Sequence, residues 1–189
     1  MIQTDMKLDA KGLACPMPVV KTKKAMQQLS PGQVLEVQAT DKGSIADIKA
    51  WAQSAGHQYI GVHEEEGVIT HYLRKTAGEE AEAKRFPHVV SNEELQAVLA
   101  VDEDVQIVDV RESAEYAFGH IPGALSAPFG ELEAVLRSLD QETSIYVICR
   151  TGNRSDMAAQ KLAAAGFRNV KNVVPGMSGW NGSIQKLMN

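Results

Sequence analysis

Hydrophobic and polar positions in the first 75 residues follow helical and extended spacing in turn. Residues 6–9 suit a short strand. Apolar residues then recur at helical spacing from Val19 to Leu29, until the sequence SPG at 30–32 ends the helix. The sequence QVLEVQAT that follows alternates with a period of two, which predicts a strand with at least one buried face.

A second helix and a hairpin complete this half of the chain. Ser44 followed by Asp47 resembles a capping box and predicts a helix start, and Gly56 ends the helix. Its predicted buried face consists of Ile45, Ile48, Ala52 and Ala55. The sequences HQYIGVHE and VITHYLRK, joined by a turn at EEG, indicate a hairpin. The order βαβαββ predicts a small two-layer sandwich domain over residues 1–75.

A second domain is predicted over residues 86–189, after the linker TAGEEAEAKR at 76–85, which has no apolar face. Ser91 and Glu94 form a predicted capping box, and VQIVDV is a near-continuous apolar run, typical of a parallel strand covered on both faces. The strands SIYVI and VKNVV alternate with helical patterns, including one near 131–139 and a last short helix at the chain end. The second half is therefore predicted to be an α/β domain with a parallel central sheet.

The net charge of −5 argues against a general nucleic-acid binder. Residues 1–75 carry 9 Lys and Arg against 8 Asp and Glu, whereas residues 76–189 carry 10 against 16, so the acidic excess lies in the second domain. The N-terminus has no apolar leader, and no segment approaches the ~18 apolar residues of a membrane span. These features predict a cytoplasmic protein with neither nucleic acid nor membrane among its partners.

Cys149 is one of only two cysteines and directly follows the apolar strand SIYVI. The thiol is therefore expected at the carboxyl end of a sheet strand, where open α/β sheets bind ligands. The next residues turn the chain into a helix, and their backbone N–H groups, with Arg150 and Arg154, form a predicted anion cradle. Such a setting favours thiolate over thiol and predicts a reactive sulfur rather than a buried structural cysteine.

The sequence IVDVRESAEYAFGHIPGALSAPF, followed by YVICRTGNRS, resembles the rhodanese family over about residues 86–189. The resemblance implies a sulfurtransferase in which Cys149 accepts a sulfane sulfur as a persulfide and passes it on, with no metal or organic cofactor. A loop of six residues from Cys149 to Arg154 suits sulfur, whereas phosphatases of related fold use one residue more. The residues expected to bind an anionic donor such as thiosulfate, or a persulfide, are Arg150, Thr151, Gly152, Asn153 and Arg154.

Other charged residues are expected to support the fold. Asp109 and Arg111 match the DVR element of the rhodanese family and are expected to form a buried structural charge pair beside the loop. Pro175 replaces a glycine that the family usually shows before the final Trp180. The five histidines have no metal-ligand spacing, so no metal site is predicted.

The other cysteine, Cys15, stands in the sequence CPMP. Proline suits a first helical turn, so the thiol is expected at a helix N-terminus that favours thiolate, with a plain buried cysteine as the alternative. The sequence LDAKGLACPMPVVKTKKAM, with SPGQVLEVQATDKGSIADIKAW behind it, resembles the TusA/SirA family over residues 1 to about 75. This resemblance implies that Cys15 carries sulfur as a persulfide and passes it to protein partners. The nearby lysines suit docking onto an acidic partner or form a solvated face: Lys21, Lys23 and Lys24.

The chain is thus predicted to be a two-domain sulfurtransferase in which sulfur passes from Cys149 to Cys15 and then to a protein or small-molecule thiol. A linker of ten residues spans roughly 15–20 Å as a flexible chain, and tethering gives an effective concentration of about 1 mM. Two alternatives remain open. One is a redox module in which Cys15 and Cys149 form a reversible disulfide, and the other is an interaction module with an inert rhodanese fold.

Overall fold

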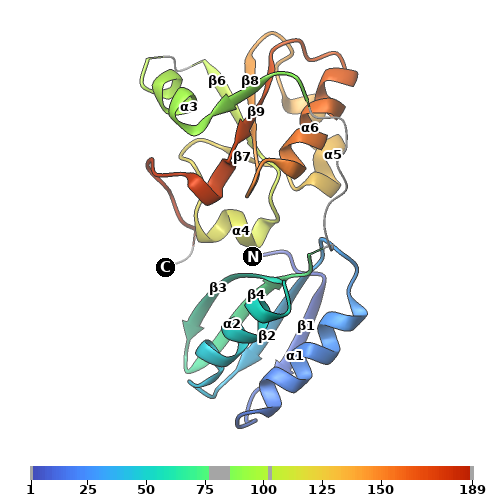
Figure 1. Cartoon of the computed structure of the whole chain (residues 1–189), viewed down its shortest axis with the longest axis vertical. Coiled ribbons are helices and arrows are strands. Elements are labelled where there is room, and N and C mark those ends of the chain that lie inside the picture. Colours follow the sequence, from blue (N-terminus) through green and yellow to red (C-terminus); the bar gives the residue numbers. More distant parts are fainter. Residues whose placement is uncertain (1, 77–85, 102–103, 188–189) are drawn as a thin grey trace. The chain divides into compact units, whose positions relative to one another are not determined.

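The computed structural model describes residues 2–76, 86–101 and 104–187, and its contacts divide the chain into two units (Figure 1). The described residues up to 76 belong to the first unit, and those from 86 onward belong to the second. Except for Thr76, the predicted linker 76–85 lies outside the described residues, so the predicted domain boundaries remain predictions.

The first unit has the predicted order βαβαββ. Its elements are β1 (Met6–Ala10), α1 (Met17–Gln28), β2 (Val34–Ala39), α2 (Ser44–Ser54), β3 (Gln58–Glu65) and β4 (Val68–Arg74). The strands form one mixed sheet in the order β1-β2-β4-β3, in which β1 and β2 are parallel and the other pairs are antiparallel. The predicted hairpin is the antiparallel pair β3 and β4.

Both helices of the first unit pack on one face of the mixed sheet, as Figure 1 shows. Leu35 and Val37 point from β2 into this core, where they meet Met26 of α1 and Ile48 of α2. The two-residue alternation of β2 therefore places its apolar side chains against the helices. Ala55, predicted on the buried face of α2, is exposed because the helix ends one residue before it.

The predicted capping box at Ser44 and Asp47 is wrong. The N-cap of α2 is Gly43, and no side chain caps this helix. Ser44 instead places its hydroxyl 3.0 Å from Nε2 of the buried His71, whose Nδ1 lies 2.8 Å from the Tyr59 hydroxyl. Burial lowers the pKa of His71 to about 4, so the imidazole is neutral at physiological pH with both ring nitrogens partnered.

The second unit is built on a five-stranded sheet in the order β5-β9-β8-β6-β7, with every pair parallel. This arrangement confirms the predicted parallel central sheet. Its elements are β5 (Val89–Ser91), α3 (Asn92–Leu99), β6 (Val105–Asp109), α4 (Ser113–Phe118), β7 (Leu125–Ser126), η1 (Phe129–Glu131), α5 (Leu132–Val135), η2 (Leu136–Ser138), β8 (Ser144–Ile148), α6 (Asn153–Ala164), β9 (Val170–Val174) and η3 (Gly176–Gly179).

Both faces of the parallel sheet are covered, which explains the continuous apolar character of its central strands. Val147 of β8 packs with Leu162 of α6 on one face, while Ile148 packs with Leu95 of α3 on the other. The predicted capping box that starts α3 is confirmed, because Ser91 and Glu94 exchange both hydrogen bonds.

Two predicted helices of the second unit are wrong. The segment near 131–139 is broken into η1, the short α5 and η2, and only Leu132 and Leu139 along it are buried. No helix follows η3 in the described residues. The backbone of Gln185 there exchanges both hydrogen bonds with His120, and this pairing replaces the intrahelical bonds that a helix would need.

Candidate functional site

Cys149 follows β8 at the carboxyl edge of the parallel sheet, where the sequence predicted it, and only 1% of the residue is exposed. Strand β6 ends beside it, because Asp109 pairs in register with Ile148. The loops after these two strands therefore meet at the same edge of the sheet, the region in which open α/β folds place their ligands.

The sulfur of Cys149 accepts two hydrogen bonds from the loop that follows it. The backbone N–H of Gly152 donates to Sγ at 3.1 Å, and the Ser155 hydroxyl donates to Sγ at 3.3 Å. Gly152 has a φ of +103°, and its carbonyl oxygen accepts from the Asn172 amide at 3.2 Å. Two donors directed at one sulfur stabilise negative charge on it. Ser155 was missed in the sequence, although a hydroxyl residue in the first turn after the loop was the available signal.

The turn after β9 holds the start of the loop from the other side. Backbone N–H groups of Met177 and Ser178 donate to the carbonyl oxygens of Cys149 and Arg150, both at 2.8 Å. Gly176 has a φ of +70°, and a Cβ built there would overlap the Cys149 carbonyl oxygen. The segment that carries the PGMSGW sequence is therefore packed directly against the backbone of Cys149 and Arg150.

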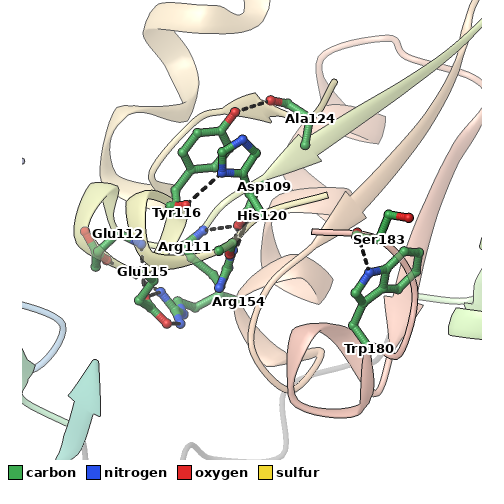
Figure 2. Close-up of polar contacts among 11 residues, drawn as sticks. Asp109, Arg111, Glu112, Glu115, Tyr116, His120, Ala124, Arg154, Trp180 and Ser183 are labelled. Atoms are coloured by element: carbon green, nitrogen blue, oxygen red, sulfur yellow. Dashed lines mark hydrogen bonds and ion pairs between the residues drawn. The ribbon is translucent and has the colours of Figure 1, made fainter. Parts of the chain in front are cut away.

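Arg154 closes the loop and points toward α4, as Figure 2 shows. Its two terminal nitrogens donate to the Glu115 carboxylate at 2.8 and 3.0 Å, and Glu112 lies 3.7 Å away. Burial alone lowers the pKa of Arg154, but the charge and hydrogen bonds of Glu115 outweigh burial and raise it. A negative charge on Cys149 also interacts favourably with this guanidinium. Arg154, predicted to bind the donor, thus has both terminal nitrogens hydrogen-bonded within the fold.

Asp109 and Arg111 form a buried ion pair, with Nη2 of Arg111 2.6 Å from Oδ2 of Asp109 (Figure 2). The same Nη2 donates to the Gly119 carbonyl at 2.7 Å. Beside it, the rings of Tyr116 and His120 stack with their centroids 3.7 Å apart. Burial raises the pKa of Tyr116, ahead of the effect of the nearby Asp109 charge. These contacts tie Arg111 and His120 to the end of α4 and the turn at Gly119.

The remaining predicted loop residues face outward. Arg150, Thr151 and Asn153 are exposed, whereas Gly152 is buried against the sulfur. The inner side of the loop therefore holds the Cys149 sulfur, and the outer side carries the positively charged Arg150.

Cys15 lies in the first unit, between β1 and α1, and its side chain is exposed. Its thiol donates a hydrogen bond to Oδ2 of Asp47 in the first turn of α2, at 3.1 Å. This hydrogen bond raises the pKa of the Cys15 thiol, as do partial desolvation and the charges of Asp47 and Asp41. The expectation that the surroundings of Cys15 favour thiolate is therefore wrong, because a carboxylate faces the sulfur. Lys23 and Lys24 are exposed on α1.

Both cysteines are free thiols. In the part of the chain that the structure describes, no group of three or more His, Cys, Asp or Glu side chains could hold a metal ion. Over the same residues, no helix combines the length and the apolar character needed to cross a membrane.

Comparisons with known proteins agree with both resemblances seen in the sequence. A family model described as Sulfurtransferase TusA matches residues 6–75, and one described as Rhodanese-like domain matches residues 91–183. The "Putative sulfur carrier protein YrkF" of Bacillus subtilis (strain 168) is 46% identical over 185 residues, which are 98% of this chain and 100% of that protein.

Single-domain relatives match each half. The sulfur carrier protein TusA of Allochromatium vinosum is 41% identical over 76 residues, which are 40% of this chain and 100% of that protein. The crystal structure of a rhodanese-like domain protein from Staphylococcus aureus is 32% identical, with a TM-score of 0.50, and covers 52% of this chain and 97% of that one. The chain therefore belongs to the family of sulfur carrier and sulfurtransferase proteins in which a TusA-like domain precedes a rhodanese-like domain.

Proposed function

We propose that Cys149 is the residue on which this sulfurtransferase first binds sulfane sulfur. The observation that carries the proposal is the pair of hydrogen bonds that Cys149 Sγ accepts from Gly152 and Ser155. Negative charge on this sulfur is needed twice, when it attacks a donor and when it leaves the persulfide. Preorganised donors stabilise that charge in both steps without rearrangement of the loop.

The proposed reaction consists of two displacements at sulfur. The Cys149 thiolate attacks the outer sulfur of thiosulfate, the sulfur–sulfur bond of the donor breaks, and sulfite leaves with the electron pair. A thiolate or cyanide then attacks the outer sulfur of the Cys149 persulfide, and Cys149 leaves again as a thiolate. Arg150, exposed beside the nucleophile, attracts the anionic donor, together with the outer side of the loop at Thr151 and Asn153.

Cyanide-dependent release of thiocyanate from thiosulfate tests the role of Cys149. Cys149→Ser abolishes this release, whereas the matched variant Cys15→Ser retains it within about twofold, because cyanide takes sulfur directly from Cys149. Thiocyanate release that persists in Cys149→Ser contradicts the proposal. A redox module based on a disulfide between the two cysteines predicts no release from the unmodified chain.

Cys15 is the second carrier in the same proposal. Its thiol is exposed and therefore open to a partner, and the domain that holds it belongs to a sulfur carrier family. Two thiols in one chain meet at an effective concentration of about 1 mM, well above that of separate proteins at ordinary assay concentrations. The relay predicts that Cys149→Ser leaves Cys15 without persulfide when thiosulfate is the only donor.

Acceptors of the relay are thiol groups of proteins that dock beside Cys15. Met17 and Val20, 44% and 39% exposed, lie on α1 near the thiol, and Lys23 and Lys24 add positive charge to the same helix. Lys23→Glu combined with Lys24→Glu should weaken transfer to an acidic protein acceptor while leaving transfer to glutathione unchanged. Equal effects on both acceptors contradict a role of these lysines in docking.

A further inference from the structure

The Cys15 thiol donates the hydrogen bond in its contact with Asp47, whereas the sulfur of Cys149 accepts its hydrogen bonds. This hydrogen bond is possible only while Cys15 carries a hydrogen on Sγ. Asp47 is half-buried in the first turn of α2. No side chain caps the N-terminus of this helix. The charged groups that act on the thiol are Asp47 and, more weakly, Asp41 from the loop before α2.

We propose that Asp47 is a positioning residue that holds unloaded Cys15 as a hydrogen-bonded thiol and releases it once Cys15 carries a sulfane sulfur. The proposal rests on the proposed function of Cys15 as a sulfur carrier. It follows from the atoms of the contact: in a persulfide the inner sulfur has no hydrogen, so the bond from Cys15 Sγ to Oδ2 of Asp47 cannot form.

Loading changes both the atoms and the charge beside Asp47. Cys15 Sγ gives up its proton and attacks the outer sulfur of a donor persulfide. The sulfur–sulfur bond of the donor breaks, and its thiolate leaves with the electron pair and takes up a proton. A persulfide is more acidic than the corresponding thiol, so the new terminal sulfur is anionic near neutral pH. Asp47 repels this anion, and the loaded side chain turns away from α2 toward solvent and toward an acceptor.

The pH profile of Cys15 alkylation tests the first half of this proposal without any sulfur donor. The full chain with Cys149→Ser leaves Cys15 as the single reactive thiol, and iodoacetamide is the probe. Asp47→Asn keeps the shape of the side chain and removes its charge. It should shift the pH profile toward lower pH and accelerate alkylation at pH 7.5 by about threefold or more. The fraction of thiolate rises as the pKa falls, and the lower intrinsic nucleophilicity of that thiolate offsets part of the gain.

Asp41→Asn is the matched control, because Asp41 acts on Cys15 through its charge alone, whereas the hydrogen bond of the thiol is with Asp47. It should move the profile in the same direction by a smaller amount. An unchanged profile in Asp47→Asn, or an equal effect of both variants, overturns the role of the Asp47 hydrogen bond. Unchanged thermal unfolding of both variants separates these effects from damage to the fold.

The second half is tested on Cys15 loaded with sodium polysulfide in the same Cys149→Ser chain. Because the persulfide no longer contacts Asp47, its alkylation rate should differ by less than about twofold between the Asp47→Asn variant and its parent. An acceleration as large as that of the thiol overturns the release. Failure of Cys15 to accept any sulfur overturns the carrier function itself and the release with it, and the thiol pH profile reports on Asp47 independently of that failure.

Discussion

The two cysteines of this chain take part in hydrogen bonds of opposite direction. Cys149 is buried at the edge of a parallel sheet, where its sulfur accepts from Gly152 and Ser155. Cys15 is exposed next to α1, where its thiol donates to Asp47. The surroundings of Cys149 direct hydrogen-bond donors at its sulfur, whereas those of Cys15 present an acceptor and raise the pKa of its thiol.

This difference suits the two roles proposed for them. A residue that must attack a small anionic donor benefits from a preformed anionic site in a rigid loop. A residue that carries sulfur between proteins benefits from exposure and from an unloaded form that reacts slowly with other electrophiles, because thiolate rather than thiol is the nucleophile. Cysteine is thus proposed to serve as a buried nucleophile in the second unit and as an exposed sulfur carrier in the first.

The largest stability effect is expected from Arg154, because its loss removes the ion pair and both hydrogen bonds that its guanidinium makes with the buried Glu115 carboxylate. Arg154→Ala should destabilise the second unit by about 3–5 kcal/mol. Urea unfolding followed by Trp180 fluorescence in a Trp51→Phe background reports on this unit. The exposed Arg150 is the matched control, and Arg150→Ala should change stability by less than about 0.5 kcal/mol. Equal stabilities of the two variants contradict the structural role of Arg154.

The first unit should instead be sensitive to acid through His71. The folded-state pKa of about 4 lies below the unfolded value of 6.5, so the unfolded chain binds the proton first as the pH falls. The stabilisation is present above pH 6.5 and is lost progressively down to pH 4, a change of about 3 kcal/mol. Unfolding followed by Trp51 in a Trp180→Phe background measures it. His71→Gln should flatten this pH dependence, and an unaltered slope in that variant assigns the acid sensitivity to another group.

A smaller difference between a variant and its control is expected at Gly176, which supports the Cys149 loop. Gly176→Ala forces a Cβ onto the Cys149 carbonyl oxygen, whereas Gly166→Ala, also at a positive φ, meets open space. Strain from φ alone costs about 1 kcal/mol at either site, and the overlap should add about 2 kcal/mol at Gly176. The Gly176 variant should also lose thiocyanate release. Equal stability and activity of the two variants would show that the turn does not set the position of the loop.

The smallest effect is expected from the hydroxyl that donates to Cys149. Ser155→Ala removes one of the two hydrogen bonds to Sγ and should slow thiocyanate release by about tenfold. Ser178→Ala is a control for a hydroxyl in the neighbouring turn, where Oγ donates to the Pro175 carbonyl instead of the sulfur. Similar rates in both variants contradict a specific contribution of Ser155.

Local patterns in the sequence predicted the order of elements in the first unit and the place of Cys149 in the second, because a continuous apolar strand and a strand-to-helix turn are both local features. Long-range partners were not predictable in this way. Ser44 and Asp47 have the spacing of a capping box, yet they contact His71 and Cys15, which are brought to α2 by other strands and turns. Arg154 was likewise predicted as an anion ligand from its position, and its contact with Glu115 spans 39 positions of the chain.

The order in which the two cysteines acquire sulfur tests the central claim most directly. The reduced full chain is mixed with thiosulfate, stopped at intervals by alkylation, and the persulfide on each cysteine is quantified by peptide mass spectrometry. We predict that sulfur occurs first on Cys149 and later on Cys15, on Cys149 alone in Cys15→Ser, and on neither position in Cys149→Ser. Persulfide on Cys15 in the Cys149→Ser chain, or on Cys15 before Cys149 in the unmodified chain, would contradict the account.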